Sequence, residues 1–264
     1  MRPLIEFSRE ARAKIRYVLT DIDDTLTNDG QLPAAAYMAM EKLHTAGIKV
    51  IPITGRPAGW CDHIARMWPV DGLVGENGAF YFRYDAESRK MVRRYFKNET
   101  ERIEDRKKLK ALECKILEEI PGCAVAADQA YREADLAIDF CEDVPALPMT
   151  EVRHIAEMFS EVGAEAKISS IHVNGWFGGY DKLSMTRTFL KEVYGEDLDA
   201  IREQVVFCGD SPNDCPMFSF FPHGVGVANV KDLEQEMDAL PSWITPERGG
   251  YGFAQLAEAL LDAR

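Results

Sequence analysis

The 264-residue sequence lacks a cysteine pair with the Cys-x-x-Cys spacing of a zinc site, although it contains six cysteines. We interpret these cysteines as reduced thiols, several of them in apolar surroundings. No apolar run is long enough to cross a membrane, and the basic first 16 residues lack the apolar centre of a signal peptide. We therefore expect a cytoplasmic protein with a loosely attached N-terminal arm.

The sequence also has no excess of basic over acidic residues, no internal repeat and no low-complexity tract. Its 31 Lys and Arg residues against 44 Asp and Glu residues give a net charge of −13. Nucleic acids and anionic membranes attract a basic surface, so we predict neither as a partner. A phosphorylated substrate remains possible, because a bound metal and a few cations can reverse the field within one cleft. At this length the chain forms either one large domain or two modest ones.

What the sequence does contain is an apolar run that ends in three aspartates, Tyr-Val-Leu-Thr-Asp-Ile-Asp-Asp-Thr-Leu-Thr at positions 17–27. The run predicts a buried parallel strand, and α/β sheets usually hold ligands where such strands end. Side chains two positions apart lie on the same side of an extended chain, so the carboxylates of Asp21 and Asp23 would lie close together. They repel each other unless a cation or a proton lies between them. Mg²⁺ fits this role, and a metal-neutralised aspartate can attack phosphorus. An acidic turn is the alternative interpretation.

Strands and helices alternate at both ends of the chain, which predicts an α/β fold with a Rossmann-like parallel sheet. Between residues 84 and 179 the pattern changes to hairpin strands and two amphipathic helices, which is typical of an α+β module. We therefore predict a discontinuous catalytic core, residues 1–83 and 180–264, with a specificity domain, residues 84–179, inserted into it.

Further polar residues stand at predicted strand ends and helix starts. Thr54 can donate its hydroxyl to a phosphate oxygen, and Lys182 begins a helix whose N-terminus attracts anions. Asp210 and Asp214 would bring two more carboxylates to the metal. Each of these residues has an ordinary alternative role, in a turn or as a solvated surface group.

Taken in order, these segments resemble the four signatures of the haloacid dehalogenase (HAD) superfamily of phosphohydrolases. The segment Glu76-Asn77-Gly78-Ala79 resembles the subfamily with an inserted α+β cap of type IIB (C2B), which includes Cof-like, sucrose-phosphate and trehalose-phosphate phosphatases. Many of these enzymes have Lys-Gly where this chain has Lys182-Leu183. The four matching segments are Asp21 to Thr27, Thr54, Lys182, and Gly209 to Asp214.

The resemblance implies a role for each matching residue. Asp21 would be the nucleophile that becomes phosphorylated, and Asp23 would be the general acid and base. Thr54 and Lys182 would complete the catalytic set. The cofactor would be Mg²⁺, held by the Asp21 carboxylate, the Asp23 backbone carbonyl and Asp210, while Asp214 would orient metal waters or Lys182.

Substrate contacts are expected from both domains. The segment 169–176 of the cap mixes hydrogen-bonding groups with an aromatic side chain, which suits a sugar ring. A half-buried strand face is an equal alternative for its His172 and Trp176, and Arg132 and Lys167 could bind a second anionic group. The predicted substrate-binding residues are Gly55, Arg56, Asn77, His172, Asn174, Trp176, Ser211 and Asn213.

We therefore predict a Mg²⁺-dependent phosphatase that hydrolyses a small phosphorylated metabolite, in first place a sugar phosphate. The expected state is a monomer or a homodimer. A sugar phosphomutase of the phosphomannomutase type is the first alternative, and it would not release inorganic phosphate as its main product. A non-catalytic binding protein that has kept the fold is the second.

Overall fold

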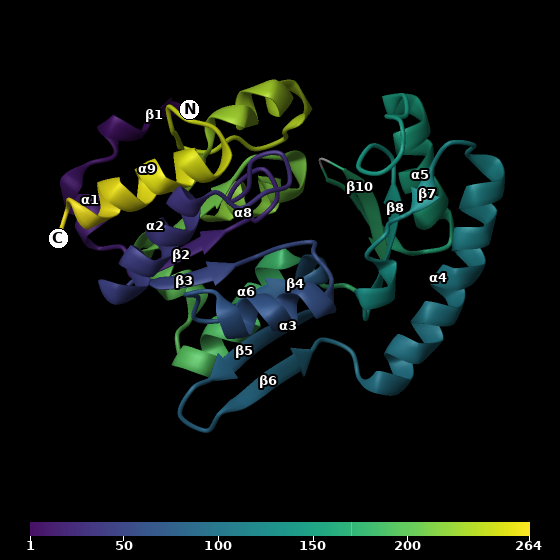
Figure 1. Cartoon of the computed structure of the whole chain (residues 1–264), viewed down its shortest axis with the longest axis horizontal. Coiled ribbons are helices and arrows are strands. Elements are labelled where there is room, and N and C mark those ends of the chain that lie inside the picture. Colours follow the sequence, from purple (N-terminus) through teal and green to yellow (C-terminus); the bar gives the residue numbers. More distant parts are fainter. Residues whose placement is uncertain (170) are drawn as a thin grey trace.

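The computed structural model describes residues 1–169 and 171–264, so Ser170 of the predicted substrate-contacting segment lies outside the described residues. Two parts face each other across the molecule (Figure 1). The larger part is built on a six-stranded sheet in which each neighbouring pair of strands is parallel. In spatial order its strands are β1 (Arg2–Pro3), β13 (Trp243–Ile244), β12 (His223–Gly226), β11 (Val205–Gly209), β2 (Tyr17–Thr20) and β3 (Lys49–Pro52).

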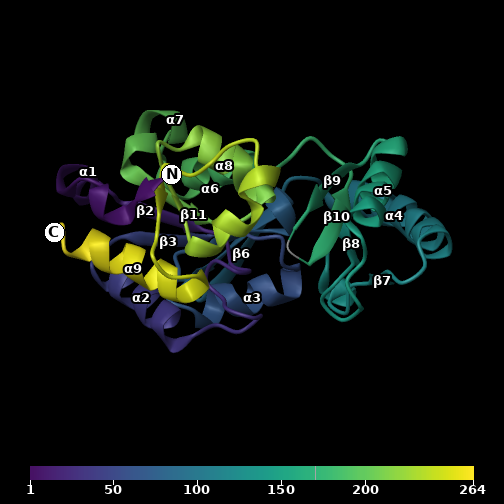
Figure 2. The same cartoon turned by 90° about the horizontal axis from the view of Figure 1, so that it is seen from above.

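Helices cover both faces of this sheet (Figure 2). Successive side chains of a strand point to opposite faces, so Val18 packs with the helices of one face and Leu19 with those of the other. The predicted α/β fold with a parallel sheet is confirmed. One face carries α2 (Ala34–Thr45), α3 (Ala58–Met67) and α9 (Gly249–Leu261), and the other carries α6 (Lys182–Tyr194), α7 (Leu198–Ile201) and α8 (Cys215–Phe220).

A three-stranded antiparallel sheet extends the larger part beyond β3. It contains β4 (Leu73–Gly75), β5 (Phe80–Asp85) and β6 (Lys90–Tyr95), and a parallel bridge between Ile53 and Val74 joins it to β3. The β5–β6 hairpin crosses residue 84, where the predicted insertion begins, and Tyr95 of β6 packs on Phe80 and Phe82. The domain boundaries themselves stay a prediction.

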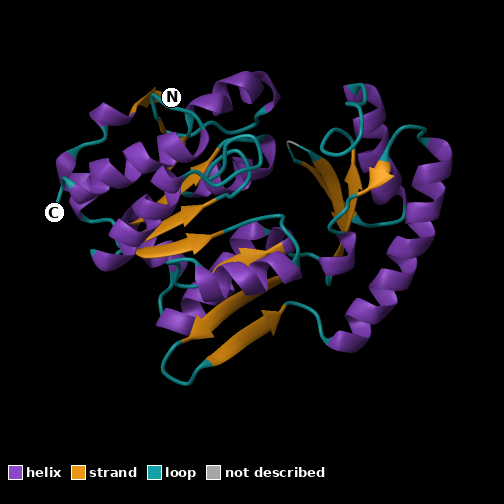
Figure 3. Cartoon of the chain, in the orientation of Figure 1, coloured by secondary structure: helices purple, strands orange, loops and turns teal. Residues whose placement is uncertain are grey.

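The smaller part has its own antiparallel sheet and its own apolar core (Figure 3). Leu109, Leu112 and Ile116 lie on one buried face of its long helix, as the sequence spacing predicts. Asn98 and Glu101 form a capping box at the start of that helix. The elements are α4 (Glu99–Glu119), α5 (Met149–Glu161), and strands in the order β7 (Ala124–Val125), β8 (Asp135–Asp139), β10 (His172–Trp176) and β9 (Glu165–Ile168).

The expectation of a loosely attached N-terminal arm is wrong. Strand β1 pairs with β13, and the short helix α1 (Arg9–Ala13) follows it. Phe7 is buried and stacks on Trp243 with ring centroids 5.1 Å apart. Leu4 and Phe7 are buried apolar residues that form no periodic pattern in the sequence, so their burial could not be predicted from it. No helix within the described residues is both long and apolar enough to cross a membrane.

Candidate active site

Three adjacent strands end at one edge of the parallel sheet, and each is followed by predicted catalytic residues. Asp21 follows β2, Thr54 lies just after β3, and Asp210 follows β11. These strands pair in the order β11, β2, β3 and run parallel, so their carboxyl ends meet. Residues that are distant in the sequence therefore face one site.

Lys182 joins two of the carboxylates at this edge. Its Nζ lies 3.1 Å from Oδ1 of Asp21 and 2.8 Å from Oδ1 of Asp214. The side chains of all three residues are buried. Lys182 is the first residue of α6, where a capping box between Asp181 and Ser184 fixes the start of the helix. The fold thus aims the ammonium group into the site.

Asp210 and Asp214 are tightly held. Oδ1 of Asp210 accepts a 2.8 Å hydrogen bond from the Thr25 hydroxyl, and its Oδ2 accepts one of 3.2 Å from the Asn229 amide. Oδ2 of Asp214 accepts the backbone N–H groups of Asp210 and Ser211. Asp214 therefore uses one oxygen for Lys182 and the other to shape the turn after β11.

The carboxylate cluster fits a hard divalent cation. One oxygen each from Asp21, Asp210 and Asp214 lie within 4.8 Å of one another, and all three residues are buried. Burial raises the pKa of Asp21 to about 7 against the opposing charge of Lys182. Burial, and then the charges of Asp214 and Asp21, also raise the pKa of Asp210. An additional cation would relieve this repulsion, and Mg²⁺ prefers such oxygen ligands.

The Asp23 side chain points elsewhere. Its carboxylate forms a two-pronged ion pair with the Arg56 guanidinium, at 2.8 to 3.0 Å. Its carboxylate is therefore not a member of the buried cluster of Asp21, Asp210 and Asp214. The expected metal contact through the Asp23 backbone carbonyl stays a prediction. The side chain of Arg56 is 7% exposed and that of Asp23 is 23% exposed. A paired carboxylate at the edge of the cleft is well placed to meet a substrate.

The loop after β3 is fixed by polar contacts. The Thr54 hydroxyl is buried and accepts the backbone N–H of Arg56 at 3.0 Å, which leaves its own proton for another acceptor. Asn77 has a φ of 54° and donates its backbone N–H to the Thr54 carbonyl. A side chain at Gly55 would meet the Asn77 amide at 3.2 Å, so glycine lets these two loops approach closely.

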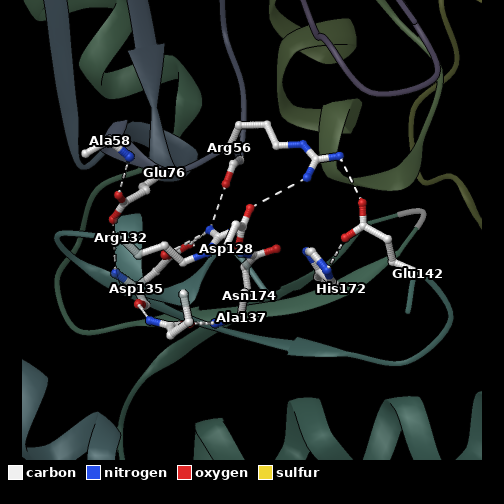
Figure 4. Close-up of polar contacts among 12 residues, drawn as sticks. Arg56, Ala58, Glu76, Asp128, Arg132, Asp135, Ala137, Glu142, His172 and Asn174 are labelled. Atoms are coloured by element: carbon white, nitrogen blue, oxygen red, sulfur yellow. Dashed lines mark hydrogen bonds and ion pairs between the residues drawn. The ribbon is translucent and has the colours of Figure 1, made fainter. Parts of the chain in front are cut away.

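Strand β10 of the smaller part supplies two of the predicted residues. Asn174 donates to Oδ2 of Asp135 at 3.0 Å, and Nε2 of His172 lies 2.9 Å from a Glu142 carboxylate oxygen. Glu142 also pairs with Arg56, at 3.3 Å, so it connects the cap strand to the core (Figure 4). Burial, and then Arg132, lower the pKa of His172.

A narrow cleft brings most of the predicted residues together, with about 20 Å³ of free space, room for roughly one water molecule. Both parts of the molecule contribute to its walls. The predicted residues that line it are Asp21, Asp23, Gly55, Arg56, Asn77, His172, Asn174, Ser211 and Asn213.

Trp176 is not brought to the cleft. It is 1% exposed, donates its indole N–H to the Tyr180 carbonyl and stacks on the Tyr180 ring. It packs into the core of the larger part, so the alternative of a buried strand face describes it better than substrate contact. Arg132, by contrast, lines the cleft, where Asp128 and Asp135 hold its guanidinium, and Lys167 is exposed.

Four acidic residues of this region were not among the predicted site residues. Glu76, Asp128, Asp135 and Glu142 bind arginines or backbone N–H groups at the boundary between the two parts (Figure 4). Asp135 gave a signal that could have been used, because it begins an apolar strand in which a buried charge needs a partner. The partners of Glu142 lie 30 and 86 residues away, and no spacing rule reveals them.

The first half of the chain is similar to a known family of hydrolases. A family model of haloacid dehalogenase-like hydrolases matches residues 18–129, which include Asp21 and Thr54. The predicted resemblance to that superfamily is confirmed, and the match supports a hydrolase. No curated protein is similar enough to count as a match.

Solved structures with the same fold cover nearly the whole chain. A protein of Thermoplasma acidophilum has a TM-score of 0.70 at 19% identity, over 95% of this chain and 99% of its own. A HAD/COF-like hydrolase of Plasmodium vivax has a TM-score of 0.69 at 19% identity, over 97% and 99%. The sucrose-phosphatase of Synechocystis, solved with sucrose and phosphate, has a TM-score of 0.62 at 17% identity, over 92% and 97%.

Proposed function

We propose that this protein is a Mg²⁺-dependent phosphatase that hydrolyses a small phosphorylated metabolite, in first place a sugar phosphate, through an aspartyl-phosphate on Asp21. The observation that carries the proposal is the buried contact of Lys182 with both Asp21 and Asp214, beside Asp210. Phosphoryl transfer needs a nucleophile held among cations, and this cluster supplies it. Phosphatases among the proteins of similar fold agree with the proposal.

In the proposed reaction the Asp21 carboxylate attacks phosphorus, and the bond between phosphorus and the ester oxygen breaks. For this step Asp23 would leave its ion pair with Arg56 and bind a proton from solvent. Asp23 then gives that proton to the ester oxygen, so the leaving group departs as an alcohol. Asp23 then takes a proton from a water molecule that attacks the phosphorus of the aspartyl-phosphate. This second step restores Asp21 and releases inorganic phosphate.

The remaining residues position the phosphoryl group. The free proton of the Thr54 hydroxyl would bind a phosphoryl oxygen, and Lys182 would hold Asp21 in place while offsetting charge. Asp21, Asp210 and the Asp23 carbonyl would hold Mg²⁺, which supplies positive charge for the phosphoryl oxygens. Asp214 would keep the ammonium of Lys182 oriented.

The cap would select the substrate and exclude water. We propose that residues 84–179 form this cap over a core of residues 1–83 and 180–264, in a cytoplasmic monomer or homodimer. Free space of about 20 Å³ beside Asp21 cannot hold a phosphoryl group, so the cap must move before the substrate enters. Closure would then surround the reacting atoms with His172 and Asn174.

Release of inorganic phosphate from a panel of phosphorylated metabolites, with Mg²⁺ and then with EDTA, tests the proposal. We expect EDTA-sensitive hydrolysis with a preference for one substrate. Asp21→Asn should lower turnover at least a thousandfold without unfolding the protein, because an amide is not a nucleophile toward phosphorus. Conversion of a sugar phosphate to its isomer without phosphate release would instead indicate a mutase, and inactivity on the whole panel would indicate a binding protein.

A further inference from the structure

A second, larger hollow lies beside the catalytic cleft. It encloses about 510 Å³ between the loop after β2, helix α3 and the cap, and we call it the aromatic pocket. Its volume is in the range of small-molecule sites, and it lies between two parts of the chain, where such sites are common. The side chains that define it are Ile22, Leu32, Trp60, His63, Trp68 and Tyr131.

The aromatic pocket and the catalytic cleft share two residues, Asp23 and Arg56. In the proposed reaction Asp23 protonates the ester oxygen, so the leaving group must begin beside this carboxylate. The cleft offers about 20 Å³ on the side of Asp21, whereas the aromatic pocket offers about 510 Å³ on the other side of the ion pair. With the cap placed as in this structure, a ring attached to the ester oxygen fits only the larger of these two pockets.

The lining shows what kind of group would bind there. Trp60 is 44% exposed, and the Arg56 guanidinium lies 4.5 Å from its ring centroid. Asp23 and Arg56, the charged groups of the wall, pair with each other and offer few free hydrogen-bonding sites. Apart from Thr27, His63 and two glycines, the remaining side chains of the lining are apolar or aromatic. Such a lining favours a flat group with an apolar face over a chain of hydroxyl groups.

The cap completes this pocket. Tyr131 belongs to the smaller part, and its side chain lies so close to α3 that a Cβ added at Gly59 would meet it at 2.9 Å. Closure of the cap therefore places an aromatic ring against the N-terminal turn of the helix that carries Trp60. A ligand ring would then lie between core and cap, beside the reacting ester.

We propose that the aromatic pocket is the leaving-group subsite, and that the substrate is a phosphomonoester whose leaving group carries a ring with an apolar face. This inference rests on the proposed phosphatase function and narrows its substrate class. An aryl ring and the apolar face of a sugar ring share this chemistry, and the experiment separates them.

The test compares wild-type protein with Trp60→Ala on three esters in the presence of Mg²⁺. Phenyl phosphate has a flat ring, glucose 6-phosphate has a hydroxylated ring, and glycerol 3-phosphate has none. For each ester we use the ratio of kcat/KM between variant and wild type, which cancels differences in leaving-group reactivity. We expect a loss of about tenfold for at least one ring ester and less than twofold for glycerol 3-phosphate.

The pattern of losses decides the inference. A loss for phenyl phosphate alone supports an aryl leaving group, and a loss that includes glucose 6-phosphate supports a sugar ring. Equal losses for all three esters, or none for either ring ester, would overturn the subsite while leaving the phosphatase function intact. If wild-type protein hydrolyses neither these three esters nor any other ester of the panel, the proposed function itself fails. Met67→Ala is the matched control, because Met67 is 64% exposed on the same helix.

A second measurement separates binding from folding. Phenylphosphonate and methylphosphonate carry the same anionic head and lack the ester bond, so they serve as inhibitors. Trp68→Ala, at another aromatic residue of the pocket lining, should raise the inhibition constant of phenylphosphonate about fivefold and leave that of methylphosphonate unchanged. Equal increases for the two inhibitors would mean that the pocket does not bind the ring.

Discussion

At the scale of single residues, the site depends on Lys182. Its ammonium contacts two buried carboxylates, and together these two carboxylates raise its pKa although burial alone would lower it. A buried charge without a partner lowers the free energy of unfolding. Removal of the Lys182 ammonium would leave the carboxylates of Asp21 and Asp214 in this state.

Lys182→Met keeps the length of the side chain and removes its charge. We expect the free energy of unfolding to fall by about 3 to 5 kcal/mol in EDTA, because Asp21 and Asp214 stay buried without their cation. Phosphate release should fall at least a hundredfold. Urea denaturation with Lys191→Met, an exposed position on the same helix, provides the control. Equal effects of the two substitutions would show that Lys182 has no special role.

His172 links pH to stability. Burial, and then Arg132, hold the pKa of its imidazole below the ordinary 6.5, against the opposing charge of Glu142. The unfolded chain therefore takes up a proton at a higher pH than the folded protein does. The free energy of unfolding should fall as the pH drops below 6.5, by at most about 1.4 kcal/mol per pH unit, until the folded imidazole is protonated too.

Urea denaturation at pH 7.5 to 5 of wild-type protein and His172→Gln measures this contribution. The excess stability of the wild-type protein over the variant should shrink as the pH falls. An unchanged difference across this range would contradict the assignment to His172.

Residues that follow strand ends could be predicted from the sequence, whereas residues paired across the fold could not. Asp21, Thr54 and Asp210 could be predicted because an apolar run that stops at a polar residue marks the edge of a parallel sheet. The partnership of Asp23 with Arg56 spans 33 residues and depends on how two loops pack. Trp176 was misjudged because an aromatic residue in an alternating strand can face either side.

At the scale of elements, the carboxylate of Glu76 ties the turn after β4 to the cap. Glu76 is fully buried, and its backbone has a φ of 42°. Its carboxylate accepts hydrogen bonds from the backbone N–H groups of Ala58 in α3 and of Glu133, Ala134 and Asp135. One side chain thus satisfies the start of α3 and the start of β8. Such a residue fixes where the cap strand begins relative to the core.

Glu76→Ala removes the acceptor of these four N–H groups. Buried donors without partners are costly, so we expect the free energy of unfolding to fall by about 3 kcal/mol. Amide hydrogen exchange of residues 133–135 should become faster than in Glu157→Ala, a substitution at an exposed position of α5. Unchanged exchange in that segment would show that its amides are protected by other contacts.

At the scale of the whole molecule, the core and the cap meet through charged groups. Arg56 of the core binds Asp23 of its own part and Glu142 of the cap, and its Nη1 lies 3.6 Å from Asp128 of the cap (Figure 4). The strand pattern predicted the parallel sheet of the larger part and antiparallel strands in the smaller part, because hydrophobic periodicity is local. It could not predict their mutual placement, which depends on contacts between side chains up to 86 residues apart.

Glu142 is the residue through which closure can be tested, because it contacts both Arg56 and His172. Its side chain is 33% exposed, so we expect its ion pair with Arg56 to contribute about 1 kcal/mol, which is roughly a fivefold shift toward open molecules in Glu142→Gln. Small-angle X-ray scattering should then show a larger radius of gyration. Glu161→Gln, which weakens an exposed pair with Lys115 inside the cap, is the control. Identical scattering of all three proteins would mean that apolar contacts, such as that of Tyr131 with α3, hold the cap closed without Glu142.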